Sequence, residues 1–147
     1  MYKRILVPTD GSALSKKAVR SAVDLASSVG AEVVAMSVVP RYPMSFFEGG
    51  ANVSPAEVAR VEKQWAEQGQ ARADEVGKAA EKAGVKAKSI TVRSDLVAEA
   101  ILAAARKNKC DLVVMASHGR KGLKRLLLGS ETQHVLTHGE IPVLVLR

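Results

Sequence analysis

The stretch that decides the fold is Leu112-Val-Val-Met-Ala-Ser-His-Gly-Arg-Lys-Gly-Leu-Lys-Arg-Leu-Leu-Leu-Gly-Ser130. Its first residues, Leu112 to Met115, form an apolar run that predicts a buried strand. At its other end, Gly129 and Ser130 predict the start of a helix. Glycine lets backbone N–H groups approach an anion closely, and a helix N-terminus presents unpaired N–H groups to it. The stretch therefore predicts a strand, a turn suited to phosphate, and a helix.

The turn differs from the two commonest phosphate loops. The chain has no Gly-x-x-x-x-Gly-Lys-Ser/Thr, and no Gly-x-Gly-x-x-Gly follows its first predicted strand. Four cations lie within the turn: Arg120, Lys121, Lys124 and Arg125. They can neutralise phosphate charge, or they can form a solvated basic loop. The glycines, rather than the cations, therefore carry the prediction of an anion site.

Strand and helix patterns alternate outward from this stretch along the chain. Predicted strands cover residues 4–8, 32–39, 85–92, 112–116 and 141–146. Predicted helices start at the N-cap residues Ser12, Ser54, Asp95 and Ser130, and Gly30 and Gly84 end the first two. Gly69 and Gly77 lie inside the second helix, where we expect lower stability and a possible bend. This alternation predicts an α/β fold with a parallel sheet covered by helices on both faces.

The expected ligand site lies at the carboxyl ends of the strands. In open parallel sheets, ligands bind there, near the point where the strand order reverses. The first strand ends in Pro8-Thr9-Asp10, and the fourth ends in Ala116-Ser-His118. We therefore expect these two polar segments to converge on one crevice.

Composition limits the classes of function. With 147 residues, a net charge of +7 and 3% aromatic residues, the chain predicts one domain over residues 1–147 with an aliphatic core. So few aromatic residues disfavour a nucleic-acid partner despite the positive charge. No apolar stretch reaches the roughly 18 residues of a membrane span. The single Cys110 excludes an internal disulfide and is interpreted as a small residue at the edge of the core. Without a signal segment, these features indicate a cytoplasmic protein.

On these residues the chain resembles the universal stress protein family. The resemblance rests on four segments in family-like order and spacing: Ile5–Ser12, Ser117–Gly122, Leu126–Ser130 and Pro142–Arg147. It implies a flavodoxin-like, open five-stranded parallel sheet of order 3-2-1-4-5. It also implies a homodimer in which the last strands pair antiparallel through Val143, Leu144, Val145 and Leu146. Such pairing would protect an apolar edge strand from aggregation.

The resemblance also implies a nucleotide site. ATP-binding members of the family carry Gly, two residues, Gly, nine residues, Gly, and then Ser or Thr. Gly119, Gly129 and Ser130 match this pattern, whereas Ala116 replaces its first glycine. The added methyl group either blocks close approach of the backbone or is tolerated if φ is negative there. We expect ATP with Mg²⁺ or Mn²⁺ as the ligand, and the alternative is a nucleotide-free, dimeric interaction module.

The resemblance assigns a role to each site residue. Adenine would lie near Val38, between Pro8 and Met115. Asp10 would contact the ribose or, through water, a metal ion, although it can instead cap a turn. Ser130 would donate to phosphate, or act only as an N-cap, and His118 would contact the ribose or phosphates, or bond to backbone. The full predicted set is Pro8, Thr9, Asp10, Val38, Met115, Ala116, His118, Gly119, Arg120, Gly129, Ser130 and Glu131.

The predicted function is therefore nucleotide binding by a stress-response regulator or protective module. Phosphate hydrolysis needs a positioned base or a group that orients water, and Asp10 is the one evident acid in the expected crevice. No Ser-His-Asp or Cys-His arrangement is visible, so we expect at most slow ATP hydrolysis. His134 and His138 have a metal-ligand spacing but no third ligand nearby, which favours a surface interpretation. The loop 40–53, with Tyr42, Phe46 and Phe47, is interpreted as a lid or a partner-binding patch.

Overall fold

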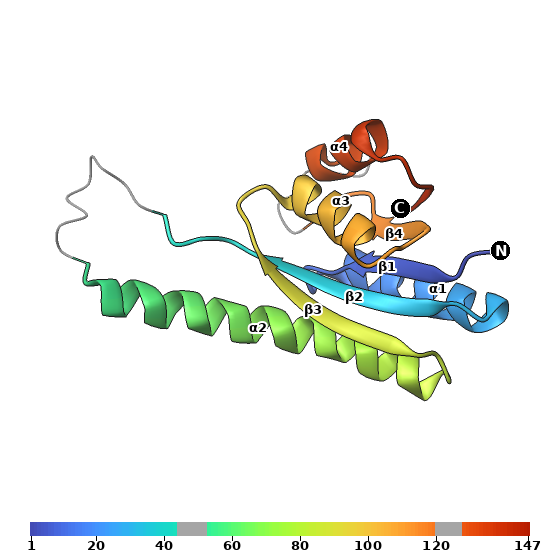
Figure 1. Ribbon diagram of the computed structural model, residues 1–147, viewed down its shortest axis with the longest axis horizontal. Helices are drawn as coiled ribbons and strands as arrows, with labels where there is room; N and C mark the ends of the chain where they lie inside the picture. The colour runs from blue at the N-terminus through green and yellow to red at the C-terminus, as the bar shows by residue number, and fades with distance from the viewer. Residues whose placement is uncertain (44–52, 120–127) are drawn as a thin grey trace.

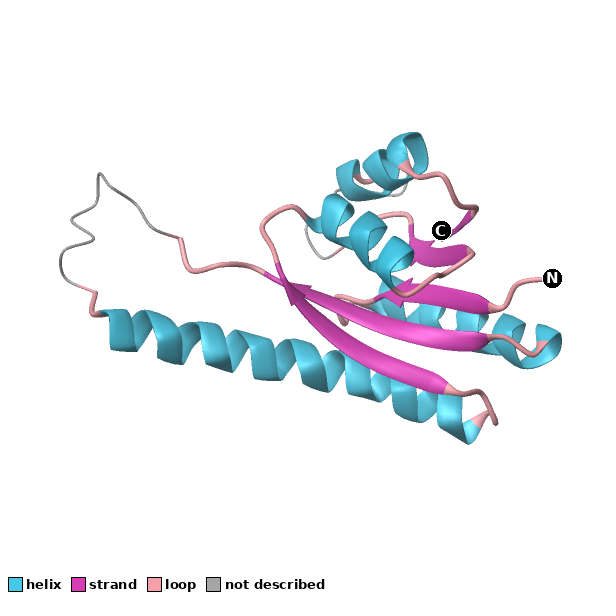
Figure 2. Cartoon of the chain, in the orientation of Figure 1, coloured by secondary structure: helices cyan, strands magenta, loops and turns pink. Residues whose placement is uncertain are grey.

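The computed structural model describes residues 1–43, 53–119 and 128–147 (Figure 1). Within them one parallel sheet contains β1 (Arg4–Pro8), β2 (Glu32–Val39), β3 (Ala87–Arg93), β4 (Leu112–Ala116) and β5 (Val143–Leu146). The strand order is β3-β2-β1-β4-β5, which confirms the expected order 3-2-1-4-5 (Figure 2). The order reverses beside β1, so the loops after β1 and β4 leave the sheet on opposite faces.

Two helices cover each face of the sheet. Helices α1 (Ala13–Val29) and α2 (Pro55–Lys82) lie on one face, and α3 (Val97–Lys107) and α4 (Ser130–His138) lie on the other (Figure 1). This division follows from right-handed crossovers, because the chain moves one way across the sheet to reach β2 and β3 and the other way to reach β4 and β5. No helix in the described ranges is both long and apolar enough to cross a membrane.

The core consists of two aliphatic layers separated by the sheet. Side chains alternate between the faces along each strand. Ile5 and Val7 therefore pack in the layer under α1 and α2, whereas Leu6 packs under α3 and α4. All five residues of β4 are buried, which explains why its sequence is continuously apolar rather than alternating. Cys110 is also buried, and burial raises the pKa of its thiol to about 11, in agreement with the core-edge interpretation.

Side-chain capping confirms two of the predicted helix starts. The Ser12 hydroxyl accepts a hydrogen bond from the backbone N–H of Ser15 at 3.2 Å. The Ser54 hydroxyl accepts one from the N–H of Glu57, also at 3.2 Å. Gly30 ends α1 in the left-handed conformation with φ of 71°, as its position after the last apolar residue predicted.

The predicted N-cap at Asp95 is wrong. Helix α3 starts after Leu96, whose side chain forms no capping bond. The Asp95 carboxylate instead accepts from the backbone N–H of Arg41 at 2.9 Å. Glu131, at the start of α4, accepts from the N–H of Ala98 at 2.9 Å and so satisfies the first turn of α3. The start of α3 is thus capped by a residue 33 positions away in the sequence, and a local sequence pattern cannot predict such a contact.

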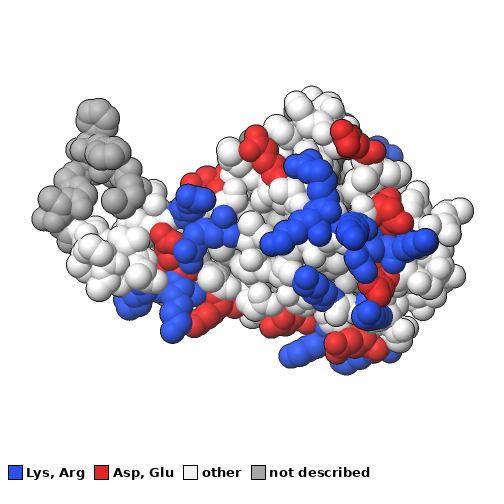
Figure 3. Space-filling model, in the orientation of Figure 1, with Lys and Arg blue, Asp and Glu red and all other residues white. Residues whose placement is uncertain are grey.

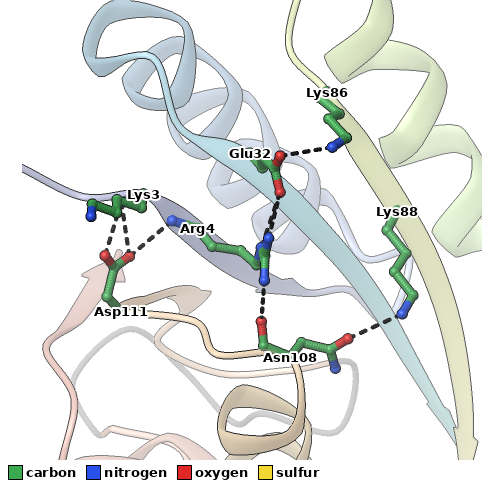
Figure 4. A network of polar contacts seen from close by, with 7 residues as sticks. All are labelled: Lys3, Arg4, Glu32, Lys86, Lys88, Asn108 and Asp111. Atoms are coloured by element: carbon green, nitrogen blue, oxygen red, sulfur yellow. Dashed lines mark hydrogen bonds and ion pairs between the residues drawn. The ribbon is translucent and has the colours of Figure 1, made fainter.

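A polar network joins the strands at their amino ends (Figure 4). The Arg4 guanidinium donates to the Glu32 carboxylate at 2.8 and 3.0 Å and to the Asn108 carbonyl at 2.8 Å. Asp111 accepts from the backbone N–H of Arg4 at 3.0 Å. The bond from Lys86, and then that from Arg4, lowers the pKa of Glu32 below its ordinary value. Figure 3 shows Lys and Arg side chains interrupted by acidic ones over this side of the molecule.

The glycines inside α2 are packing residues. The helix is continuous from Pro55 to Lys82, so the glycines do not end it. A Cβ atom at Gly69 would lie 2.5 Å from Val39 Cγ1, and one at Gly77 would lie 2.6 Å from Ser89 Oγ. These glycines therefore let α2 approach β2 and β3 more closely than any larger residue would allow.

We predict that Gly69→Val lowers the free energy of unfolding by about 1–3 kcal/mol, the usual cost of overpacking a filled core. Urea denaturation followed by circular dichroism measures the change. The matched control is Ala71→Val, at an exposed position on the same helix. Equal stability losses in the two variants would show that the helix propensity of valine, rather than contact with Val39, causes the effect.

Candidate functional site

The loop after β1 is held by short polar side chains. The hydroxyls of Thr9 and Ser15 share a hydrogen bond at 2.8 Å, and the backbone N–H of Gly11 donates to Thr9 Oγ1 at 3.2 Å. Gly11 has φ of 77°, a left-handed conformation that favours glycine. Asp10 Oδ1 accepts from the backbone N–H of Ser12 at 2.9 Å, so this carboxylate does cap the turn. The same bond fixes the direction of the carboxyl group.

The end of β4 is tied to the start of α4. The backbone N–H of Gly129 donates to the Ser117 carbonyl at 2.7 Å, and the Thr132 hydroxyl donates to the Ala116 carbonyl at 2.9 Å. The Ser117 hydroxyl and the His118 ring share a hydrogen bond at 3.2 Å. Two hydrogen bonds therefore join the end of β4 to the start of α4 directly.

Two glycines permit the close approaches in this region. A Cβ atom at Gly119 would lie 2.8 Å from Asp10 Oδ2. At Gly129, a Cβ atom would lie 3.0 Å from the Ser117 carbonyl oxygen and 3.1 Å from His118 Cα. The structure thus brings the segments after β1 and β4 together, and the backbone of Gly119 lies against the Asp10 carboxylate.

Ala116, the departure from the glycine pattern, is an ordinary strand residue. It ends β4, where it pairs in register with Leu146 of β5. Among the described non-glycine residues, only Lys109 has a positive φ, so the backbone at Ala116 is in a region open to every residue. The methyl group therefore costs no backbone strain.

Apolar residues form a wall on the α3 side of the crevice. Met115 is buried in the layer under α3 and α4, and Val38 packs against the same layer. Pro8, the last residue of β1, is half-buried. Val38, Pro8 and Met115 thus come from three neighbouring strands of the sheet, at or near their carboxyl ends.

The structure describes some of the remaining predicted residues and not others. Ser130 is the first residue of α4 and Gly129 its N-cap, so the interpretation of Ser130 as an N-cap is wrong. Glu131 directs its carboxylate to α3, and therefore positions α4 against α3. Arg120, with Lys121, Lys124 and Arg125, lies outside the described residues, as do Phe46 and Phe47. Tyr42 is described and stacks on Trp65 with ring centroids 6.2 Å apart.

The histidine pair on α4 is a local contact. The rings of His134 and His138 stack with centroids 4.2 Å apart, and His138 Nδ1 also contacts the Thr137 hydroxyl at 2.9 Å. In the part of the chain that the structure describes, no group of three or more His, Cys, Asp or Glu side chains is arranged to hold a metal ion.

Two residues that sequence reasoning missed hold the site together. Thr132 is 2% exposed, and Ser117 is 6% exposed. Each lies beside a predicted residue, but their importance comes from buried hydrogen bonds that join segments distant in sequence. No local sequence pattern marked Thr132, because its burial is visible only in the fold.

A five-stranded parallel sheet of order β3-β2-β1-β4-β5, with helices on both faces, defines a flavodoxin-like α/β protein. The model of the universal stress protein family matches residues 1–147, and the chain belongs to this family. It is 36% identical over 154 residues to universal stress protein MJ0531 of Methanocaldococcus jannaschii, covering 100% of this chain and 83% of that protein.

Solved structures are similar over almost the whole chain. The structure of MJ0577, from the same organism, has a TM-score of 0.83 and 29% identity, with 99% of this chain and 96% of that chain covered. A universal stress protein in complex with cAMP has a TM-score of 0.65 and 23% identity, with 98% and 95% covered. At this identity, the similarity to the cAMP complex is evidence for the fold alone.

We predict that Thr132→Val lowers the free energy of unfolding by about 1–3 kcal/mol, because it leaves the buried Ala116 carbonyl without its donor while conserving volume. Urea denaturation measures the loss. The control is Thr137→Val, whose hydroxyl bonds at the exposed surface of the same helix. A loss in Thr132→Val no larger than in the control would show that the bond from Thr132 to the Ala116 carbonyl does not stabilise the fold.

Proposed function

We propose that this chain binds an adenine nucleotide, ATP with Mg²⁺ or Mn²⁺, in the crevice after β1 and β4. In this proposal it acts as a stress-response regulator or a protective binding module. The observation that carries the proposal is the contact of the Gly119 backbone with the Asp10 carboxylate at the reversal point of the sheet. A glycine at this contact keeps space and backbone N–H groups available beside an acid that can accept from ribose hydroxyls.

The residues of the crevice suit the parts of such a ligand. Val38, Pro8 and Met115 offer an apolar wall to the base. The start of α4, at Gly129 and Ser130, offers backbone N–H groups and the positive end of the helix dipole to phosphates. Asp10 is an oxygen donor of the type that hydrated Mg²⁺ uses, and the ion would neutralise phosphate charge when bound.

Family membership supports this assignment of the ligand. The complex of a universal stress protein with cAMP shows that this fold can accommodate an adenine nucleotide. In this chain Gly119, Gly129 and Ser130 retain the spacing of the family's ATP-binding pattern. The backbone at Ala116 is unstrained, so conformational strain does not argue against a nucleotide.

The proposed activity is binding rather than turnover. Phosphoryl transfer needs a group that orients or deprotonates the attacking water. Asp10 is held by Ser12 and assigned to the ribose or the metal, and Glu131 is bound to α3. With these acids committed elsewhere, we expect hydrolysis to be slow at most.

The proposal predicts micromolar binding of ATP in the presence of Mg²⁺, measured by isothermal titration calorimetry. Gly119→Val should weaken it by about tenfold or more, because the side chain would occupy the space beside Asp10. Ala103→Val, at an exposed position of α3, is the control for an added valine. If the parent chain binds no ATP at millimolar concentration while Ala116→Gly does, the chain is a nucleotide-free member of the family.

We also propose that the chain forms a homodimer by antiparallel pairing of β5. This strand is the edge of the sheet and pairs on one side with β4. Leu144 is 41% exposed on it, an apolar side chain on an unpaired edge. Pairing with a second copy would satisfy the free backbone groups and cover this leucine.

We predict that Leu144→Lys shifts the protein from dimer to monomer in size-exclusion chromatography with light scattering. The charge would be buried at the centre of the paired edge, where desolvation disfavours it. Leu96→Lys is the control, since Leu96 is 60% exposed before α3 and lies away from β5. A parent chain that stays monomeric across the concentration range would contradict the dimer.

A further inference from the structure

A cleft of about 250 Å³ lies between α1 and α2, on the face of the sheet opposite α3 and α4. Its floor consists of the buried side chains of Val19 and Val76. Its charged walls come from Lys16 and Arg20 of α1 and from Arg72 and Glu75 of α2. The nucleotide crevice, in contrast, has its apolar wall under α3. From the β1–α1 loop, Thr9 and Gly11 also line the cleft.

The cleft carries an excess of positive charge. Three cations face one carboxylate, and Lys16 and Arg20 lie on one side of α1 because they are four residues apart. Within residues 1–43, 53–119 and 128–147, none of these four charged groups forms an ion pair. At the amino ends of the strands, by contrast, the cations are paired: Arg4 and Lys86 both form ion pairs with Glu32.

Arg72 contributes a donor that lacks an acceptor. Its Nε atom is shut off from solvent and has no hydrogen-bond partner in the described part of the chain. Buried donors are normally paired, so the unpaired Nε favours a rearrangement of this side chain that brings it an acceptor. The Nε and Nη groups of a guanidinium form a planar fork that fits two oxygens of a phosphate.

We infer that this cleft is a second binding site, for a small phosphate-bearing anion such as a phosphomonoester. The three cations and Glu75 sum to two positive charges, which match the charge of nearly −2 on a phosphomonoester at neutral pH. On binding, Arg72 turns its guanidinium fork toward the phosphate, Lys16 and Arg20 neutralise it, and Val19 and Val76 contact the carbon part. A carboxylate, with a single charge, would leave the cleft positive.

Calorimetric titration of the nucleotide-free chain with inorganic phosphate and with glycerol 3-phosphate tests the site. We expect saturable binding at one site, weakened about tenfold or more in Arg72→Gln and strengthened about threefold in Glu75→Gln. Lys78→Gln, an exposed position of α2 outside the cleft, is the matched control and should change little. A stronger response to glycerol 3-phosphate identifies an ester as the ligand, and equal responses identify free phosphate.

The variants separate this site from the nucleotide crevice. Arg72→Gln should leave ATP affinity unchanged, and Gly119→Val should leave phosphate binding unchanged. The inference is overturned if neither anion binds saturably up to about 10 mM, if Lys78→Gln weakens binding as much as Arg72→Gln, or if Gly119→Val abolishes it. Glu75 is exposed, so Glu75→Gln still provides the test if Arg72→Gln does not fold.

Discussion

The structure depends on the complete burial of β1 between two helical layers. Ile5, Leu6 and Val7 are each 0% exposed, and β2 and β4 pair with β1 on either side. With both faces covered and both edges paired, the strand meets solvent only at its ends. Because the order of the sheet reverses beside β1, the loops after β1 and β4 leave the sheet on opposite faces, and this is the position at which open parallel sheets bind ligands.

The two ends of the sheet use polar side chains differently. At the amino end, Arg4 and Lys86 are paired with Glu32, so long charged side chains neutralise one another and join neighbouring strands. In the loops after β1 and β4, at the carboxyl end, short side chains and backbone groups make the bonds, as in the contact of Gly129 with the Ser117 carbonyl. Short side chains fix these two loops close to the sheet, without the long charged pairs of the amino end.

Local patterns were enough to predict the strands and most of the helices, because apolar periodicity and capping residues act over a few positions. The cap at Asp95 failed because Glu131, on a different helix, satisfies the start of α3. Gly69 is a weak point of α2 by helix propensity alone, but it permits the close contact of α2 with Val39 of β2. For the site, the glycine spacing was visible in the sequence, whereas the contact of Gly119 with Asp10 and the bond from Thr132 required the fold.

The direction of the Ala116 side chain bears on the missing glycine. Along β4, Leu112 and Val114 face α1, whereas Val113 and Met115 face α3. The alternation continues to Ala116, so its methyl group lies on the α1 side of the sheet. The apolar wall proposed for the base is on the α3 side, with Met115 and Val38. A methyl group at this position therefore points away from the face proposed for the base, and alanine restricts the strand backbone more than glycine would.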